Sequence, residues 1–156
     1  MRILGIDPGL AIVGFAILDK ENDKKTLIEA GVIRTHKDRT HSQRLKEIYD
    51  DMQAIIREYK PDICAIEQIF FSKNVTTGIK VSQARGVTLL ALEEAGIEIH
   101  EFNPKSMKLS LTGDGNADKK AIQKMVMLEL KLDQPPKPDD AADAVSLALT
   151  LCSELR

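Results

Sequence analysis

The chain begins with a short apolar run that ends on a carboxylate and a Pro-Gly turn, Arg2-Ile3-Leu4-Gly5-Ile6-Asp7-Pro8-Gly9. An apolar run bounded by turn residues predicts a buried β-strand over residues 2–7. A carboxylate at the end of such a strand must pair, cap a turn or bind a cation, because an isolated buried charge is unfavourable. Asp7 is therefore either a metal ligand or a carboxylate that is hydrogen-bonded to the turn after it.

The composition is that of an ordinary globular protein. Apolar residues make up 43% of the 156 residues and charged residues 29%, which argues against a disordered chain. The 22 Lys and Arg against 24 Asp and Glu give a net charge of -2. This balance lacks the basic excess of many nucleic-acid binders, although a basic face can coexist with an acidic site. The length predicts one domain, residues 1–156, with its own core.

The sequence contains no signal for a membrane or an oxidising compartment. The N-terminus enters a strand without an apolar signal region. No apolar run approaches the roughly 18 residues of a membrane span. Cys64 and Cys152 lie far apart among apolar residues, which predicts buried thiols in a reducing compartment. We therefore expect a cytoplasmic protein.

The spacing of apolar residues predicts an α/β fold. Strands over 2–7, 12–19 and 27–34, joined by turns at Gly9 and 20–25, predict an antiparallel meander. Strands and helices then alternate, which predicts a mixed sheet flanked by helices. The later strands are expected at 62–67 and 97–102. Helices are expected at 42–59, 75–95, 118–130 and 139–155, and a further short helix is expected to begin at residue 104. The last helix is apolar nearly all round and should be buried.

Three further acids stand in apolar surroundings. Glu67 ends the fourth predicted strand, and Asp140 and Asp143 lie three residues apart on one face of the last helix. The helix dipole also favours acids in a first turn, which explains Asp139 well, Asp140 partly and Asp143 poorly. If the first and fourth strands are neighbours, Asp7 and Glu67 meet at their ends. Clustered carboxylates repel unless a divalent cation neutralises them, and hard oxygen ligands favour Mg²⁺ or Mn²⁺ over zinc.

Other site motifs fail on their spacing. The segment 114–125 opens like an EF-hand loop, but Lys119 replaces the required glycine and Met125 replaces the acid at the twelfth position. The sequence contains no GxxxxGK[ST] motif, which excludes a P-loop. The histidines are scattered along the chain and are predicted to be surface residues: His36, His41 and His100.

Four segments together resemble the RuvC Holliday-junction resolvases: Gly5-Ile6-Asp7-Pro8-Gly9, Ala65-Ile66-Glu67-Gln68, Gln83-Ala84-Arg85-Gly86-Val87 and Asp140-Ala141-Ala142-Asp143-Ala144. The resemblance covers nearly the whole chain. It implies a ribonuclease H-like (RNase H-like) fold with a mixed five-stranded sheet. It also implies a structure-selective endonuclease that cuts two opposed strands of a four-way DNA junction during homologous recombination and DNA repair. The residues that it assigns as catalytic and metal-binding are Asp7, Glu67, Asp140 and Asp143, while Asp139 stays open as an additional ligand.

The resemblance further implies the cofactor and the partners. Two Mg²⁺ ions about 4 Å apart, for which Mn²⁺ can substitute, would clamp the scissile phosphate and activate a water molecule. The product would carry a 5′-phosphate and a 3′-hydroxyl. The implied partners are four-way junction DNA, a second copy of the chain in a homodimer, and the RuvA–RuvB branch-migration complex. The helix over 75–95 is more apolar than one buried face requires, so it is our candidate for part of the dimer interface.

Aromatic and basic residues provide the predicted DNA contacts. Phe70 and Phe71 either pack in the core or include a ring that stacks on a junction base, a contact worth roughly 1–3 kcal/mol. In the family pattern an aromatic at Phe70 resembles such a wedge, while Phe71 departs from the pattern, so which of the two rings faces DNA stays open. Lysines between 73 and 124 are mostly expected on a solvated face, but Lys108 and Lys119 match family positions near the DNA backbone. The predicted DNA-binding residues are therefore Phe70, Phe71, Lys73, Lys108, Lys119 and Lys120.

Three alternatives compete with a junction resolvase. Another nuclease of the RNase H fold would cut RNA–DNA hybrid or duplex DNA, and a comparison of substrates separates the two. An actin-like ATP-binding domain also opens on a Gly-x-Asp-x-Gly turn, but it needs a second duplicated domain for which 156 residues are too few. A non-catalytic junction binder would not need Asp143 inside an apolar helix.

Overall fold

The computed structural model describes residues 1–69 and 75–155. One five-stranded sheet has the order β3-β2-β1-β4-β5. β1, β2 and β3 form an antiparallel meander, whereas β4 pairs in parallel with both β1 and β5. The predicted mixed sheet is confirmed. The strands are β1 (Arg2–Asp7), β2 (Ile12–Glu21), β3 (Lys24–Arg34), β4 (Ile63–Glu67) and β5 (Glu98–Phe102).

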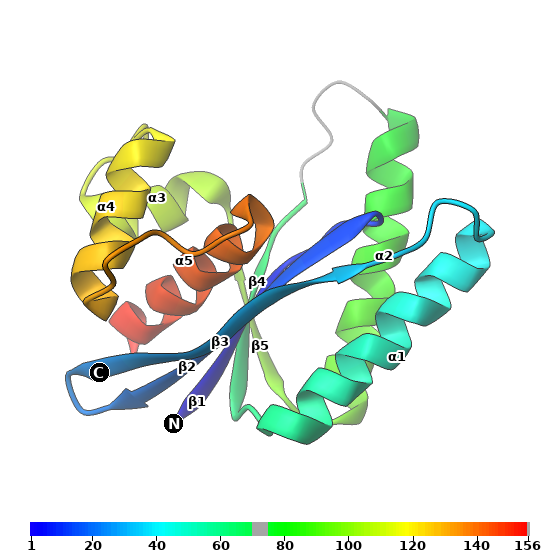
Figure 1. The fold of residues 1–156 in the computed structure, drawn as a ribbon, viewed down its shortest axis with the longest axis horizontal. Coiled ribbons are helices and arrows are strands. Elements are labelled where there is room, and N and C mark those ends of the chain that lie inside the picture. Colours follow the sequence, from blue (N-terminus) through cyan, green and yellow to red (C-terminus); the bar gives the residue numbers. More distant parts are fainter. Residues whose placement is uncertain (70–74, 156) are drawn as a thin grey trace.

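Helices cover both faces of this sheet (Figure 1). Successive side chains of a strand point to opposite faces, so Leu4 and Ile6 of β1 enter one apolar core and Ile3 enters the other. The helices α1 and α2 cover the Leu4 face, and α5 covers the Ile3 face with α3 and α4 beside it. Their bounds are α1 (His41–Tyr59), α2 (Val75–Glu94), α3 (Pro104–Thr112), α4 (Lys119–Leu130) and α5 (Asp139–Glu154).

The helix α5 is buried as its sequence predicts. Every residue from Ala144 to Cys152 is buried. The helix lies against β1 and β2 along its length and is backed by α3 and α4. Within the described residues, no helix combines the length and the apolar character needed to cross a membrane.

The hairpin between β2 and β3 is longer than predicted. Residues 20–25 were expected to form a turn, but β2 continues to Glu21 and β3 starts opposite it at Lys24. Asn22 has a φ of 54°, in the left-handed region that asparagine tolerates and that a two-residue hairpin loop requires. The run of charges that suggested a long turn belongs largely to the ends of two strands.

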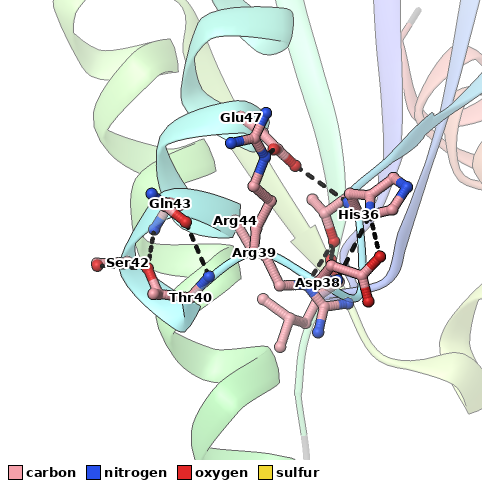
Figure 2. Close-up of polar contacts among 10 residues, drawn as sticks. His36, Asp38, Arg39, Thr40, Ser42, Gln43, Arg44 and Glu47 are labelled. Atoms are coloured by element: carbon pink, nitrogen blue, oxygen red, sulfur yellow. Dashed lines mark hydrogen bonds and ion pairs between the residues drawn. The ribbon is translucent and has the colours of Figure 1, made fainter.

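Polar side chains fix the start of α1 and the loop before it (Figure 2). The Thr40 hydroxyl accepts a hydrogen bond from the Gln43 backbone N–H, and the Gln43 side chain accepts one from the Thr40 N–H at 2.9 Å, a capping box. Arg44 Nε donates to Thr35 Oγ1 at 2.8 Å, and the Thr35 hydroxyl donates to the Leu10 carbonyl at 2.6 Å. These bonds tie the loop before α1 to the turn after β1.

Two histidines are more buried than predicted. His36 is exposed as expected, but His41 and His100 are half-buried. His41 starts α1, and its Nε2 lies 2.5 Å from Oε1 of Gln83 on α2, because these two helices pack against each other. Cys64 and Cys152 are free and buried, which confirms the prediction of buried thiols.

Candidate active site

The C-terminal ends of β1 and β4 bring Asp7 and Glu67 together. The two strands are adjacent and parallel, with Ile6 opposite Ile66, so the next residue of each strand leaves the sheet at the same edge. The neutral Asp7 carboxyl group donates a hydrogen bond to Glu67. The turn after β1 is held by Thr35, which donates to the carbonyls of residues 10 and 11. Asp7 is therefore directed toward another acid.

Two glycines allow α5 to contact the sheet backbone directly. Gly14 lies opposite Asp7 in the β1–β2 register, and a Cβ atom at Gly14 would lie 1.9 Å from the carbonyl oxygen of Asp140. A Cβ atom at Gly5 would lie 2.1 Å from the carbonyl oxygen of Ala144. Because real Cβ atoms do not approach so closely, a larger residue at either position would push the helix away. The glycines therefore seat the first turn of α5 over the strand beside Asp7.

The acids at this end of the sheet change one another's pKa values. Burial raises the pKa of Asp7 to about 8, and the charge of Glu67 adds to this effect, with smaller contributions from Asp143 and Asp140. Burial also raises the pKa of Glu67; the hydrogen bond from Asp7 opposes this shift, and the charge of Asp143 adds to it. Asp143 is exposed, but partial desolvation by its surroundings raises its pKa as well, and the positive charge of Lys119 opposes the shift. Without a cation, this cluster is short of positive charge.

Asp139 has a partner outside the group of predicted ligands. Its Oδ2 lies 2.5 Å from Nζ of Lys119, in an exposed ion pair between the starts of α5 and α4. This bond raises the pKa of Lys119, and the charges of Asp143 and Asp140 act in the same direction. Asp139 thus pairs with a lysine at the rim, whereas Asp140 and Asp143 act electrostatically on Asp7.

A cleft of about 260 Å³ opens beside the acids. Glu67 and Asp143 line it together with two lysines, Lys108 of α3 and Lys119 of α4. The rest of its wall is largely apolar and includes Met107, Ile122, Val126, Ala142 and Leu147. Acidic and basic side chains therefore line the same cleft.

The other predicted DNA-binding residues are not all at this cleft. Lys120 is the neighbour of Lys119 on α4, but it lines a separate hollow with Lys124, Leu128 and Pro135. Successive residues of a helix point in different directions, which explains this separation. Phe70, Phe71 and Lys73 lie outside the described residues.

Two residues that support the acids were given no role there by the sequence analysis. Gly14 was not singled out, because its role depends on a helix more than a hundred residues away in the sequence. Arg85 donates from Nε to the Glu67 backbone carbonyl at 3.1 Å and forms an ion pair with Glu101 at 2.7 Å. The signal that could have revealed Arg85 is its place in the segment 83–87, one of the four that carry the family resemblance.

The side chains of the four predicted acids are of the type that binds a hard divalent cation. Carboxylate oxygens are the ligands that Mg²⁺ and Mn²⁺ prefer, and the raised pKa of Asp7 marks a site that lacks a counter-charge. In residues 1–69 and 75–155, no three His, Cys, Asp or Glu side chains are arranged to hold a metal ion as they stand. A cation at this site therefore requires the carboxylates to turn toward one another, which its positive charge favours.

Sequence comparisons identify close relatives over the full chain. The family model for the crossover junction endodeoxyribonuclease RuvC matches residues 3–151. The protein of that name from Thermosipho melanesiensis is 47% identical over 156 residues, which cover 100% of this chain and 99% of the relative. The protein of that name from Brevibacillus brevis is 49% identical over 150 residues, covering 96% of this chain and 90% of the relative.

Solved structures agree with the sequence comparisons. The structure of Thermus thermophilus RuvC matches with a TM-score of 0.91 at 30% identity and covers 98% of this chain and 94% of that one. The structure of T. thermophilus RuvC in complex with a Holliday junction substrate matches with a TM-score of 0.90 at 31% identity, covering 96% and 92%. The likeness confirms the predicted RNase H-like α/β fold. The chain therefore belongs to the RuvC family of crossover junction endodeoxyribonucleases.

Proposed function

We propose that this chain resolves four-way DNA junctions by metal-dependent hydrolysis of a phosphodiester bond in each of two opposed strands. One observation carries the proposal: the acids of β1, β4 and α5 gather at one edge of the sheet, beside a cleft that is rimmed by lysines. The proposal is also supported by a structural relative that was solved with a Holliday junction substrate. The predicted alternative, an enzyme for RNA–DNA hybrid or duplex DNA, is not favoured by relatives named crossover junction endodeoxyribonucleases.

In the proposed reaction the carboxylates of Asp7, Glu67, Asp140 and Asp143 hold two Mg²⁺ ions, for which Mn²⁺ can substitute. When bound, the cations lower the pKa of the attacking water and balance the charge of the phosphate and the leaving oxygen. The chain itself provides rigid strand ends for Asp7 and Glu67 and seats α5 against Gly14. Asp139 is left to its ion pair with Lys119.

The lysines of the cleft are the proposed contacts to the DNA backbone. Lys108 and Lys119 come from two different helices and face the same space as Glu67 and Asp143. Ammonium groups there can bind phosphates on either side of the scissile bond, which positions the substrate without reading its sequence. Binding should therefore weaken as the salt concentration rises.

Cutting two opposed strands requires two active sites, and we propose a homodimer that uses α2. Val75, Ile79 and Leu90 are 65%, 49% and 52% exposed. Their spacing places these apolar side chains on one face of the helix. Exposed apolar side chains that share one face of a helix can form part of an interface between proteins. By its family resemblance, we also expect the chain to act with the RuvA–RuvB branch-migration complex.

A cleavage assay tests the proposed function. A synthetic four-way junction, linear duplex DNA and an RNA–DNA hybrid are each incubated with the protein in Mg²⁺ or in EDTA. We expect preferential cleavage of the junction, no cleavage in EDTA, and no cleavage by Asp7→Asn, which should still bind the junction. Asp19→Asn is a matched control, because Asp19 pairs with Arg2 at the opposite end of β1. Undiminished cleavage by Asp7→Asn would overturn the assignment.

A further inference from the structure

We infer that Arg85 is a positioning residue, which holds Glu67 in place and thereby sets the affinity of the site for its cation. The inference rests on the proposed function, since it concerns the same carboxylates. Arg85 belongs to α2, on the face of the sheet opposite to α5. Its side chain is 16% exposed and reaches the end of β4.

The guanidinium group of Arg85 joins two neighbouring strands. Nε donates to the backbone carbonyl of Glu67 at 3.1 Å, and Nη2 lies 2.7 Å from Oε2 of Glu101 on β5. A largely buried guanidinium needs a counter-charge, and Glu101 provides it. The ion pair with Glu101 therefore keeps Arg85 at the point where it can hold Glu67.

The peptide group between Glu67 and Gln68 is also held by a hydrogen bond to β5. The backbone N–H of Gln68 donates to the carbonyl of Phe102 at 2.8 Å. The carbonyl of Glu67 and the N–H of Gln68 belong to one planar peptide unit. With one bond from α2 and one to the end of β5, this plane cannot rotate freely. The direction in which the Glu67 side chain leaves the backbone is thereby set relative to Asp7.

The hydrogen bond from Arg85 restrains the end of β4 against the repulsion between the acids. The carboxylates of Asp7, Glu67 and Asp143 repel one another whenever all three are ionised, as cation binding requires, and a strand end that yielded to this repulsion would move Glu67 away. A backbone that is held in the binding arrangement loses less freedom when the ion arrives. Loss of a group that orients a metal ligand from behind commonly weakens metal binding or activity 10- to 100-fold.

Arg2 offers a matched control at the far end of the sheet. Its guanidinium also joins a carboxylate and a backbone carbonyl: Nε lies 2.8 Å from Oδ1 of Asp19, and Nη1 donates to the Tyr59 carbonyl at 2.8 Å. Arg2 starts β1, whereas Asp7 ends it. Arg2→Gln therefore removes the same kinds of bond as Arg85→Gln, but away from the acids.

The experiment measures Mn²⁺ binding to the full chain without DNA, by calorimetry and by the rise in melting temperature. The variants are Arg85→Gln, Arg85→Lys, Glu101→Gln and Arg2→Gln. We expect Arg85→Gln to raise the half-saturating Mn²⁺ concentration about tenfold, and Arg85→Lys and Glu101→Gln to raise it less. Arg2→Gln should lower the melting temperature and leave Mn²⁺ binding unchanged. Junction cleavage by Arg85→Gln should recover at high Mn²⁺, with unchanged metal-free junction binding.

Two results would overturn the inference alone: an unchanged Mn²⁺ midpoint for Arg85→Gln while the wild type binds Mn²⁺, or an equal shift for Arg2→Gln. If Arg85→Gln does not fold, Arg85→Lys and Glu101→Gln decide, and no shift in either overturns the inference. A wild-type protein that takes up no Mn²⁺ and cuts no junction would overturn the proposed function and this inference with it. The two failures are therefore distinguishable.

Discussion

Asp7 and Glu67 share a hydrogen bond between their carboxyl groups, across the ends of two adjacent parallel strands. Such a bond requires a proton on one of the two groups. The proton takes the place of the positive charge that a cation would bring. Protons and cations should therefore compete for this pair.

The metal-free protein should become less stable as the pH rises. Burial raises the pKa of Asp7 from 3.8 to about 8, so the folded state holds a proton that the unfolded state releases at lower pH. The stability that this proton contributes is fully present below about pH 4 and is lost as the pH rises through about 8. Melting curves in EDTA between pH 5 and 9 should show the loss, of order 1 kcal/mol or more.

Asp7→Asn and added metal provide the controls for this pH dependence. An asparagine does not titrate, so the melting temperature of Asp7→Asn should depend less on pH. Saturating Mg²⁺ at pH 8 should raise the melting temperature of the wild type by neutralising the acids. The same slope in wild type and Asp7→Asn would contradict the assignment of this effect to Asp7.

Asp139 and Asp140 should behave differently although they are neighbours. The Asp139 carboxylate pairs with Lys119 at the rim, whereas Asp140 adds to the charge around Asp7. We expect Asp140→Asn to lower junction cleavage by about a hundredfold or more, and Asp139→Asn to change it by less than about fivefold. Initial rates at several Mg²⁺ concentrations measure both. A greater loss in Asp139→Asn would make that residue the ligand.

Gly14→Ala should impair both stability and cleavage. The new Cβ would lie 1.9 Å from the Asp140 carbonyl, so the start of α5 must move. Overpacking of this kind destabilises by roughly 1–3 kcal/mol. Gly31→Ala is the control, because its Cβ would meet only ring atoms of Phe15 at 3.0 Å, and a ring can shift. Thermal melting and cleavage rates should both show the larger effect for Gly14→Ala.

Leu90→Glu should disrupt the proposed dimer without unfolding the chain. Leu90 is 52% exposed on the apolar face of α2, and a charge there would have to be buried in the interface. Leu128→Glu is the matched control, since Leu128 is 63% exposed on α4. Sedimentation equilibrium should give a monomer for Leu90→Glu and a dimer for Leu128→Glu. Dimers of both variants would place the interface elsewhere.

Local patterns predicted the elements well. The periodic apolar residues of α1, among them Ile48 and Met52, are buried as expected, and the helix ends just before Pro61. The burial of α5 was also predicted, because a helix with apolar residues on nearly all sides has no polar face that could be exposed to solvent. The hairpin of β2 and β3 was less predictable, since its charged end resembles a loop in composition.

The sequence predicted the acids of the site, but it did not predict the residues that hold those acids in place. The acids Asp7 and Glu67 stand out because each ends an apolar strand, and their meeting depended on the order of the strands. The packing of Gly14 against α5 and the bond from Arg85 to Glu67 join residues far apart in the sequence. The spacing of residues along the chain does not predict contacts between residues that are far apart in the sequence. The half-buried position of His41 against Gln83 was missed for the same reason.

The sheet separates two apolar cores that share few side chains, one beneath α5 and one beneath α1 and α2. Substitutions in well-separated sites usually have additive effects on stability. The helix α2, which forms the proposed interface, can therefore diverge, or be redesigned, without repacking the layer that carries Asp140 and Asp143. Arg85 sets a limit to that freedom, because it belongs to one layer and holds a residue that serves the other.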